Sequence, residues 1–287
     1  MKLKGEHIMK KHLKPLSVLL VVALLLSISA LFASAGEAAP HYVVLGDSIG
    51  WGAGVMNSDE ACFGRIVANT NGYDFTRLAV NGDRSGDLLR HLGEAQYIDA
   101  VSKADIISIS IGGNDFLGNM ILLLPEGTLG IYKRFDALAD EMRSNFSQSI
   151  EIIRSLNPDV QILVHTLYNP GNFLVRATYQ QATNRINGIV RSYLEDHPGA
   201  YVIIDVASAF GSDLSYVAAD TIHPSAKGNV KIAELTLQTL HELGLGEKTE
   251  PVVLHEGVDQ IETSPRLLLK AVKLWVQFLF GLVKNVL

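Results

Sequence analysis

Short apolar segments rich in β-branched residues alternate along this chain with longer segments of helical periodicity, and this alternation constrains the fold more than any other feature. Strand-like segments occur at 41–45, 74–80, 105–111, 160–167 and 201–206. Helical patterns fill the gaps between and after them, at about 60–70, 85–93, 132–156, 175–196 and 225–243. Strands that alternate with helices of this length form βαβ units. The sequence therefore predicts an α/β fold with a five-stranded parallel sheet.

The strand-like segments are apolar throughout, with little alternation, as expected for strands that helices cover on both faces. The loops that follow are different, because glycine, aspartate, serine, asparagine and histidine are concentrated there. Open α/β sheets bind ligands at the carboxyl ends of their strands. A functional site is therefore expected in the loops at that edge of the sheet.

The charge of the chain is unevenly distributed. The net charge is −6, yet both ends are basic and the long stretch between them is acidic. An acidic body argues against nucleic acid as a partner, because phosphate binding requires a basic surface. Each basic end accompanies an apolar segment, and this combination indicates a membrane surface or an export machinery.

Residues 1–35 have the pattern of a secretory signal peptide. Lysines precede an apolar stretch from Leu16 to Leu26, and residues 33–35 (Ala-Ser-Ala) provide a small-residue cleavage site. An uncleaved membrane anchor is the alternative, since residues 16–35 are about long enough to span a bilayer. Both interpretations predict an exported protein, either secreted or held at the outer face of the cell membrane.

Residues 265–287 are predicted to form a basic amphipathic helix after a polar linker at 246–264, which leaves 36–245 as the main domain. Spacings of 4, 3, 4 and 7 residues place the polar side chains on one narrow stripe of that helix: Arg266, Lys270, Lys273, Gln277 and Lys284. A helix of this kind suits a membrane interface. Docking on its own domain or on a second subunit is the alternative. The charged residues interrupt the run too often for a spanning helix.

The chain has one cysteine, Cys62, which excludes an intramolecular disulfide and a cysteine-based metal site. The simplest interpretation of Cys62 is a small buried apolar residue. Five further histidines lack the spacing of metal ligands: His41, His91, His165, His197 and His255. No metal or cofactor is therefore expected.

Three residues together could form an activated nucleophile with its base and an acid that orients the base. Ser48 directly follows the first strand and lies among glycines that permit a sharp turn. A serine hydroxyl needs a base within hydrogen-bond reach, and His223 is the candidate. Asp220, three residues earlier, can accept the Nδ1 proton of His223 and leave Nε2 free to take the proton of Ser48.

A second group could stabilise negative charge on an acyl oxygen. The backbone N–H of Ser48, the backbone N–H of Gly82 and the side chain of Asn114 follow the first, second and third strands. Hydrogen-bond donors that converge on one point form an oxyanion hole. Each piece alone is common in turns and helix caps. Their joint occurrence at the ends of successive strands favours a catalytic site.

Four sequence blocks resemble those of the SGNH hydrolases, also called GDSL esterases or lipases: LGDSIGWG at 45–52, NGDRSGDLL at 81–89, IGGND at 111–115 and DTIHPS at 220–225. Ile49 is a small departure, because the family name expects leucine there. The resemblance covers about residues 41–245. It implies a three-layer α/β/α sandwich with a flavodoxin-like strand order.

The resemblance also implies a role for each matched residue. Ser48 would be the nucleophile and the first oxyanion donor, with Gly82 and Asn114 as the second and third donors. His223 would be the base and Asp220 the acid that orients it. Ester hydrolysis would then proceed by two-step acyl transfer.

The substrate is less constrained, because this family hosts several ester chemistries. Apolar residues near the site suit an acyl chain: Trp51, Phe116, Leu117 and Phe173. Together with the basic segment at 265–287, they favour an acyl-lipid or lysophospholipid-like ester. A carbohydrate O-acetylesterase is one alternative. An inactive binding module tethered to the cell surface is another.

Overall fold

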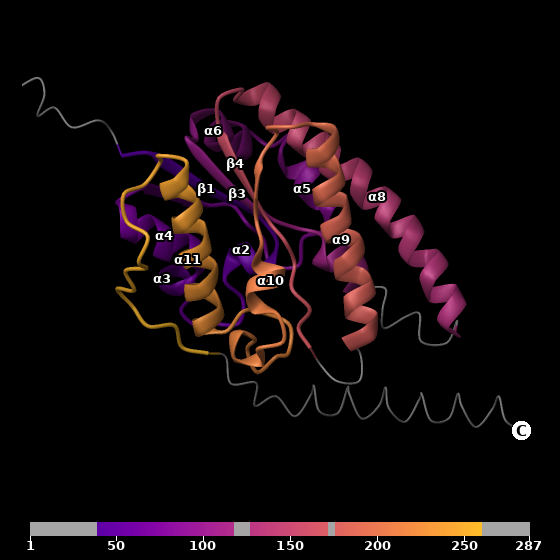
Figure 1. The fold of residues 1–287 in the computed structure, drawn as a ribbon. Coiled ribbons are helices and arrows are strands. Elements are labelled where there is room, and N and C mark those ends of the chain that lie inside the picture. Colours follow the sequence, from indigo (N-terminus) through magenta and orange to yellow (C-terminus); the bar gives the residue numbers. More distant parts are fainter. Residues whose placement is uncertain (1–38, 118–126, 172–175, 260–287) are drawn as a thin grey trace, which may run out of the picture. The chain divides into compact units, whose positions relative to one another are not determined.

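Five parallel strands form the centre of the computed structural model, which describes residues 39–117, 127–171 and 176–259 (Figure 1). The strands are β1 (His41–Gly46), β2 (Asp74–Arg77), β3 (Ile106–Ser110), β4 (Gln161–His165) and β5 (Val202–Ile204). They lie in the order β2-β1-β3-β4-β5. The chain moves to one side of β1 for β2 and to the other side for β3, which places a crevice at the carboxyl ends of β1 and β3. The predicted five-stranded parallel sheet is confirmed.

β2 is shorter than the predicted strand 74–80. Its regular pairing ends at Arg77, but Leu78 and Val80 still donate backbone hydrogen bonds to the carbonyl oxygens of Val44 and Gly46, each at 2.9 Å. The extended path therefore continues beside β1 and brings the following loop to the same edge as the end of β1.

Helices cover both faces of the sheet (Figure 1). The longer helices are α4 (Phe63–Asn71), α5 (Ser85–His91), α6 (Ala95–Lys103), α8 (Gly127–Leu156), α9 (Arg176–Asp196) and α11 (Ala226–Glu242). Four short helices are α2 (Ser48–Trp51), α3 (Ser58–Ala61), α10 (Val206–Phe210) and the 3-10 helix η2 (Leu214–Tyr216). The predictions did not include α6 or the four short helices, and the short ones span too few residues to show a helical period.

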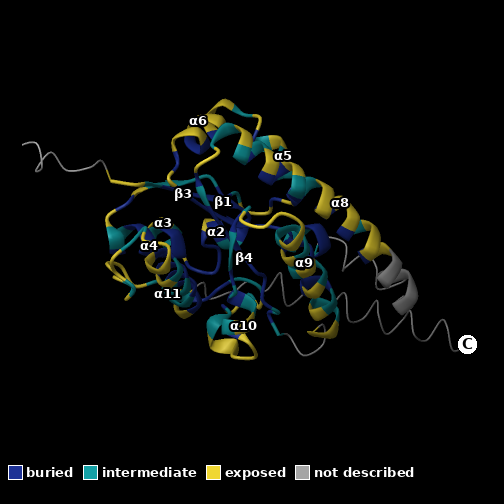
Figure 2. Ribbon diagram, turned by 45° about the horizontal axis from the view of Figure 1, so that its top comes forward, coloured by how far each residue is buried: buried dark blue, intermediate teal, exposed yellow. Residues whose placement is uncertain are grey.

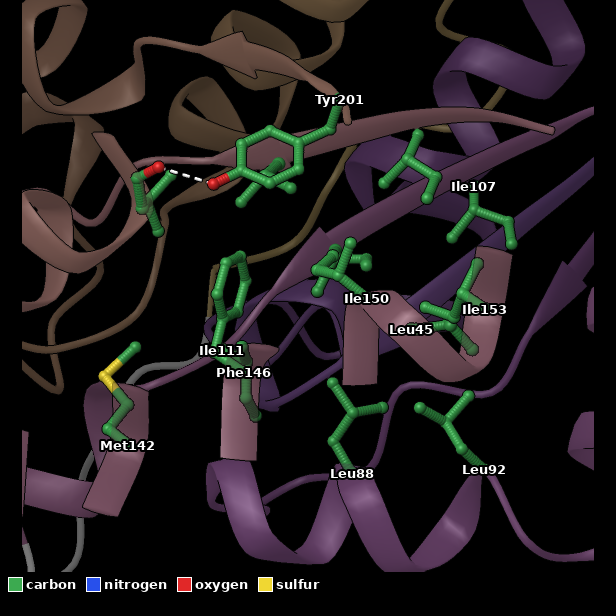
Figure 3. Packing of buried hydrophobic residues seen from close by; sticks show 14 of the residues in the cluster. Leu45, Leu88, Leu92, Ile107, Ile111, Met142, Phe146, Ile150, Ile153 and Tyr201 are labelled. Carbon is green, nitrogen blue, oxygen red and sulfur yellow. Dashed lines mark hydrogen bonds between the residues drawn. The ribbon is translucent and has the colours of Figure 1, made fainter. Parts of the chain in front are cut away.

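Side chains of the central strands alternate between two apolar cores, one on each face. Leu45 and Ile107 belong to the core cluster that includes residues of α5 and α8, and Figure 3 shows them in this cluster with Leu88 and Ile150. The opposite face packs against α4 and α11 through Tyr42 and other residues. The central strands β1, β3 and β4 are largely buried, whereas the outer helix faces are exposed (Figure 2). The arrangement is therefore a three-layer α/β/α sandwich.

Two serines of β3 lie on the face toward α4 and α11, where they are completely buried. Ser108 accepts a hydrogen bond from the Tyr42 hydroxyl at 2.8 Å. Ser110 accepts one from the Gly50 N–H at 3.1 Å and donates to Asp47 Oδ1 at 3.3 Å. Buried polar groups are tolerated when they are paired in this way. The Ser110 hydroxyl thereby anchors the segment that carries Ser48.

Residues 246–259 run back over the domain beside α4 and α3, and we call them the C-terminal strap (Figure 1). Asn71 binds the strap backbone twice, because its Oδ1 accepts from Lys248 N at 3.0 Å and its Nδ2 donates to Lys248 O at 3.2 Å. Thr70 Oγ1 accepts from Val252 N at 2.9 Å. The described part of the predicted linker 246–264 is thus attached to the domain along its length.

The predicted signal segment 1–35 and the predicted helix 265–287 lie outside the described residues. Among the helices of the described ranges, none combines the length and the apolar character needed to cross a membrane.

Candidate active site

Ser48 lies where β1 ends and α2 begins. The turn requires glycine at position 46, because φ is +114° and a Cβ atom there would lie 1.9 Å from the Ser110 carbonyl oxygen. Asp47 caps the short helix by accepting the Ile49 N–H at 3.0 Å. Ser48 is the first residue of α2, and it is only 7% exposed. Its hydroxyl is therefore held at the carboxyl edge of the sheet.

Ser48 and His223 are 175 positions apart in the sequence, and the fold brings them into contact. The Ser48 Oγ and His223 Nε2 atoms are 2.9 Å apart. On the other side of the imidazole, His223 Nδ1 lies 2.6 Å from Asp220 Oδ2. The predicted nucleophile, base and acid thus form one continuous chain of hydrogen bonds.

The Asp220 carboxylate is held ionised by its surroundings. Burial alone would raise its pKa, but hydrogen bonds from the His223 ring and from the backbone N–H groups of His223 and Ile222 lower that pKa to about 2. The two backbone bonds measure 3.0 Å and 2.9 Å and end on Oδ1. An ionised carboxylate can only accept, so Nδ1 of His223 carries a proton and Nε2 faces Ser48 as an acceptor.

The loop that carries Asp220 and His223 contains a strained residue. Thr221 has φ +63°, a conformation that β-branched residues rarely adopt and that costs on the order of 1–3 kcal/mol. Two contacts hold the loop in place: the Tyr168 hydroxyl donates to Ile222 O at 2.7 Å, and Ala218 N donates to His223 O at 2.8 Å. In this loop conformation, Oδ1 of Asp220 accepts from two backbone N–H groups while Oδ2 faces the imidazole.

The two loops predicted to carry oxyanion donors are joined to each other. Asn114, which follows β3, donates from Nδ2 to the carbonyl oxygen of Asp83 at 2.9 Å. An amide nitrogen carries two hydrogens, so a second donor remains. Gly82 lies in the turn after β2 with φ +96°. Asn114, Ser48 and His223 line one pocket, whereas Gly82 lies outside that lining.

A buried pair next to these loops was not anticipated from the sequence. Asp115 accepts hydrogen bonds from the Ser85 hydroxyl at 2.5 Å and from the Ser85 N–H at 3.0 Å. Asn145 Nδ2 of α8 donates to the same hydroxyl at 3.1 Å. Burial raises the pKa of Asp115, which opposes the effect of these donors. The pair fastens the loop after β3 to the start of α5 and so fixes Asn114 beside Asp83.

A second buried carboxyl group lies directly behind Ser48. Burial raises the pKa of Asp47 to about 7, although the Ile49 N–H and the Ser110 hydroxyl both oppose that change. The side chain also contributes to the pocket lining. Its role as the cap of α2 could have been inferred from the sequence, since aspartate before a short helix is a common cap.

The pocket beside Ser48 has a mainly apolar wall. Of the predicted substrate contacts, Phe116 and Leu117 line it. Trp51 lies outside the lining and is 38% exposed, with the Arg77 guanidinium 4.2 Å above its ring. Phe173 lies outside the described residues. Sequence reasoning missed the wall provided by α9, which consists of Tyr179, Ala182, Thr183 and Ile186. Helical periodicity indicates that such a face is covered, but not by what.

A parallel α/β sandwich with a serine, a histidine and an aspartate in contact at the carboxyl edge of its sheet defines a class of hydrolytic enzymes. Within that class, the chain belongs to the GDSL-like lipase/acylhydrolase family, whose model matches residues 44–231. The protein is accordingly a carboxylic ester hydrolase of the GDSL type, as the four sequence blocks predicted.

Relatives and solved structures agree with this assignment. The chain is 28% identical over 208 residues to the spore germination lipase LipC of Bacillus licheniformis, covering 68% of this chain and 93% of LipC. It is 29% identical over 244 residues to a lipase of Streptomyces rimosus, covering 70% and 89% of the two chains.

Two solved lipases show the shared fold. A lipase from a goat rumen metagenome has a TM-score of 0.59 at 24% identity, with 72% of this chain and 99% of the other covered. The extracellular lipase of Streptomyces rimosus has a TM-score of 0.58 at 22% identity, with 70% and 99% covered.

Proposed function

We propose that this protein is an exported serine esterase in which Ser48 attacks the ester, His223 transfers the protons and Asp220 orients His223. One observation carries the proposal: His223 lies 2.9 Å from the Ser48 hydroxyl and 2.6 Å from the Asp220 carboxylate. A serine hydroxyl becomes nucleophilic when a base so placed can accept its proton.

The reaction would proceed in two steps. His223 takes the hydroxyl proton as Ser48 Oγ bonds to the carbonyl carbon, and the resulting oxyanion accepts hydrogen bonds from the N–H groups of Ser48 and Gly82 and from the Asn114 amide. His223 then protonates the leaving alcohol as the ester C–O bond breaks. Water, deprotonated by the same imidazole, attacks the acyl carbon. The bond between that carbon and Ser48 Oγ then breaks, His223 returns the proton to Oγ, and the acid is released.

The substrate class that we favour is an acyl-lipid or lysophospholipid-like ester. The support is the apolar wall formed by Phe116, Leu117 and Ile186 beside Ser48. Apolar walls of this kind suit an acyl chain. The relatives named above carry the description lipase, which agrees with this choice.

The proposed organisation has four parts. Residues 1–35 direct export, 36–245 form the hydrolase domain, 246–264 connect, and the basic segment 265–287 contacts a membrane surface. The extracellular lipase of Streptomyces rimosus supports export. Liposome co-sedimentation of the full chain tests the membrane contact, with a variant in which Arg266, Lys270, Lys273 and Lys284 are replaced by glutamine as the comparison.

Hydrolysis of p-nitrophenyl esters of increasing acyl length tests the substrate class. We expect medium-chain esters to be cleaved faster than acetate, and a fluorophosphonate probe to label wild type but not Ser48→Ala. Strict preference for acetate would replace the lipid proposal with an O-acetylesterase. Absence of labelling in the folded wild type would favour a binding module.

A further inference from the structure

The segment that follows the nucleophile packs directly on the segment that carries the base. We call residues 52–57 the nucleophile loop. Gly54 has φ +103°, and a Cβ atom there would lie 2.3 Å from the Pro224 carbonyl oxygen and 3.0 Å from His223 Cβ. The spacing between Ser48 and His223 therefore depends on how closely these two segments are held together.

The C-terminal strap is bonded to the nucleophile loop. Met56 N donates to Val258 O at 2.7 Å. Asn57 binds the strap backbone in both directions: its Oδ1 accepts from Val258 N at 2.9 Å, and its Nδ2 donates to Glu256 O at 2.9 Å. An antiparallel bridge pairs Val55 with Asp259.

The same strap is bonded to the segment that follows His223. Asp259 Oδ1 accepts the N–H of Ala226 at 2.6 Å. Ala226 is the first residue of α11, and N–H groups of the first helical turn have no partner within the helix. A negative charge is also favourable at that end of a helix. Gly257 packs against Ala226 so closely that a Cβ atom would lie 2.7 Å from the alanine Cβ.

We propose that the end of the C-terminal strap, residues 256–259, is a positioning element of the active site, and that Asn57 and Asp259 are its positioning residues. It ties the nucleophile loop to the base segment and so keeps Ser48 and His223 in register. The strap lies beyond residues 44–231, which the family model matches. The inference rests on the proposed roles of Ser48 and His223.

The chain offers a matched control for Asn57. Asn71 grips the strap backbone with the same pair of hydrogen bonds, but at Lys248, on the far part of the strap. If the strap only stabilises the domain, Asn57→Ala and Asn71→Ala should change activity by the same factor. If the strap positions the site, only Asn57→Ala should lower the activity.

The test measures kcat and KM for a p-nitrophenyl ester, the rate of fluorophosphonate labelling and the thermal midpoint, all in the full chain. We expect Asn57→Ala and Asp259→Ala to lower kcat and the labelling rate about tenfold with KM little changed, since small misplacements of reacting groups are costly. Asn71→Ala should keep the kcat of wild type, although its thermal midpoint should be similar to that of Asn57→Ala. Asp259→Asn, which retains an acceptor for the Ala226 N–H, should recover most of the activity.

The outcomes separate the inference from the proposed function. Equal kcat for wild type, Asn57→Ala and Asp259→Ala, with Ser48→Ala inactive, would overturn the positioning role alone. An equal loss of kcat in Asn57→Ala and Asn71→Ala would reduce the strap to a stabilising element. Full activity of Ser48→Ala would remove the proposed function itself.

Discussion

The two halves of the site are built differently. The triad half, Ser48, His223 and Asp220, joins side chains from distant segments through an ionised carboxylate whose pKa is about 2. The oxyanion half, formed by the loops that carry Gly82 and Asn114, is held by a bond from Asn114 to a backbone carbonyl and by the buried Asp115, whose pKa is raised by burial. In the proposed mechanism, the first half moves protons and needs controlled protonation states. The second only has to place donors rigidly.

Removing the proposed nucleophile should give the largest effect. Ser48→Ala should lower kcat by about 10⁴-fold or more, because the alanine side chain has no hydroxyl with which to form the proposed acyl intermediate. Steady-state hydrolysis of a p-nitrophenyl ester measures the loss, with circular dichroism as the check on folding. Residual activity above a tenth of wild type would show that Ser48 is not the nucleophile.

The proposed orienting acid, Asp220, should give the next largest effect. Asp220→Asn should lower kcat by about 10²–10⁴-fold at neutral pH, because an amide can donate to Nδ1 and favour the wrong tautomer of His223. The pH dependence of kcat in wild type and variant is the measurement. A variant with wild-type kcat near neutrality would mean that Asp220 does not set the tautomer.

The oxyanion half predicts a smaller loss. Asn114→Ala should lower kcat by about 10²–10³-fold with KM little changed, as expected for one donor that acts mainly in the transition state. Parallel determination of kcat and KM tests this. A pure KM effect would instead place Asn114 in ground-state binding.

The pair formed by Ser85 and Asp115, behind the oxyanion half, should matter less for activity than for stability. Ser85→Ala removes a hydroxyl that Asp115 and Asn145 both contact, and it leaves buried polar groups short of a partner. We expect a loss of about 1–3 kcal/mol in the free energy of unfolding. We also expect a fall in kcat of less than about tenfold, because the Asn114 donor would be displaced rather than removed. Urea unfolding and ester kinetics together separate the two effects.

The smallest expected effect on activity comes from Asp47, which lies behind Ser48. Its folded pKa, about 7, lies above the ordinary value of 3.8, so the folded state holds this proton more tightly than the unfolded chain. Stability contributed by the protonated form is therefore present at low pH and is lost as pH rises from about 4 to about 7.

Asp47→Asn should remove that dependence, since an amide does not titrate and its oxygen can still accept from Ile49. The variant should gain stability over wild type as pH rises, by an amount on the order of a few kcal/mol. Urea unfolding at pH 5 and pH 8 is the measurement. If the free energy of unfolding of the variant differs from that of wild type by the same amount at pH 5 and at pH 8, the pKa of Asp47 is not raised.

Much of the framework was predictable from the sequence, because burial on both faces leaves a continuous apolar signal. All five strands and five of the six longer helices were expected, and the residues at 48, 82, 114, 220 and 223 were expected to lie at one edge. α6 was not among the expected helices, although it is as long as α4. The pocket wall on α9 was missed because its face looks like any covered helix face. Trp51 lies outside the pocket lining, because a position next to Ser48 in the sequence does not set the direction of a side chain.

The sequence alone determined the succession of strands and helices along the chain and the types of polar side chain in the loops. Both follow from patterns among neighbouring residues. Contacts between segments nearly the whole length of the domain apart were decided only by the tertiary structure. Examples are the 2.9 Å approach of Ser48 to His223 and the grip of Asn57 on the C-terminal strap. Such contacts depend on how the helices pack against the sheet. The periodicity of neighbouring residues does not predict the distances that result.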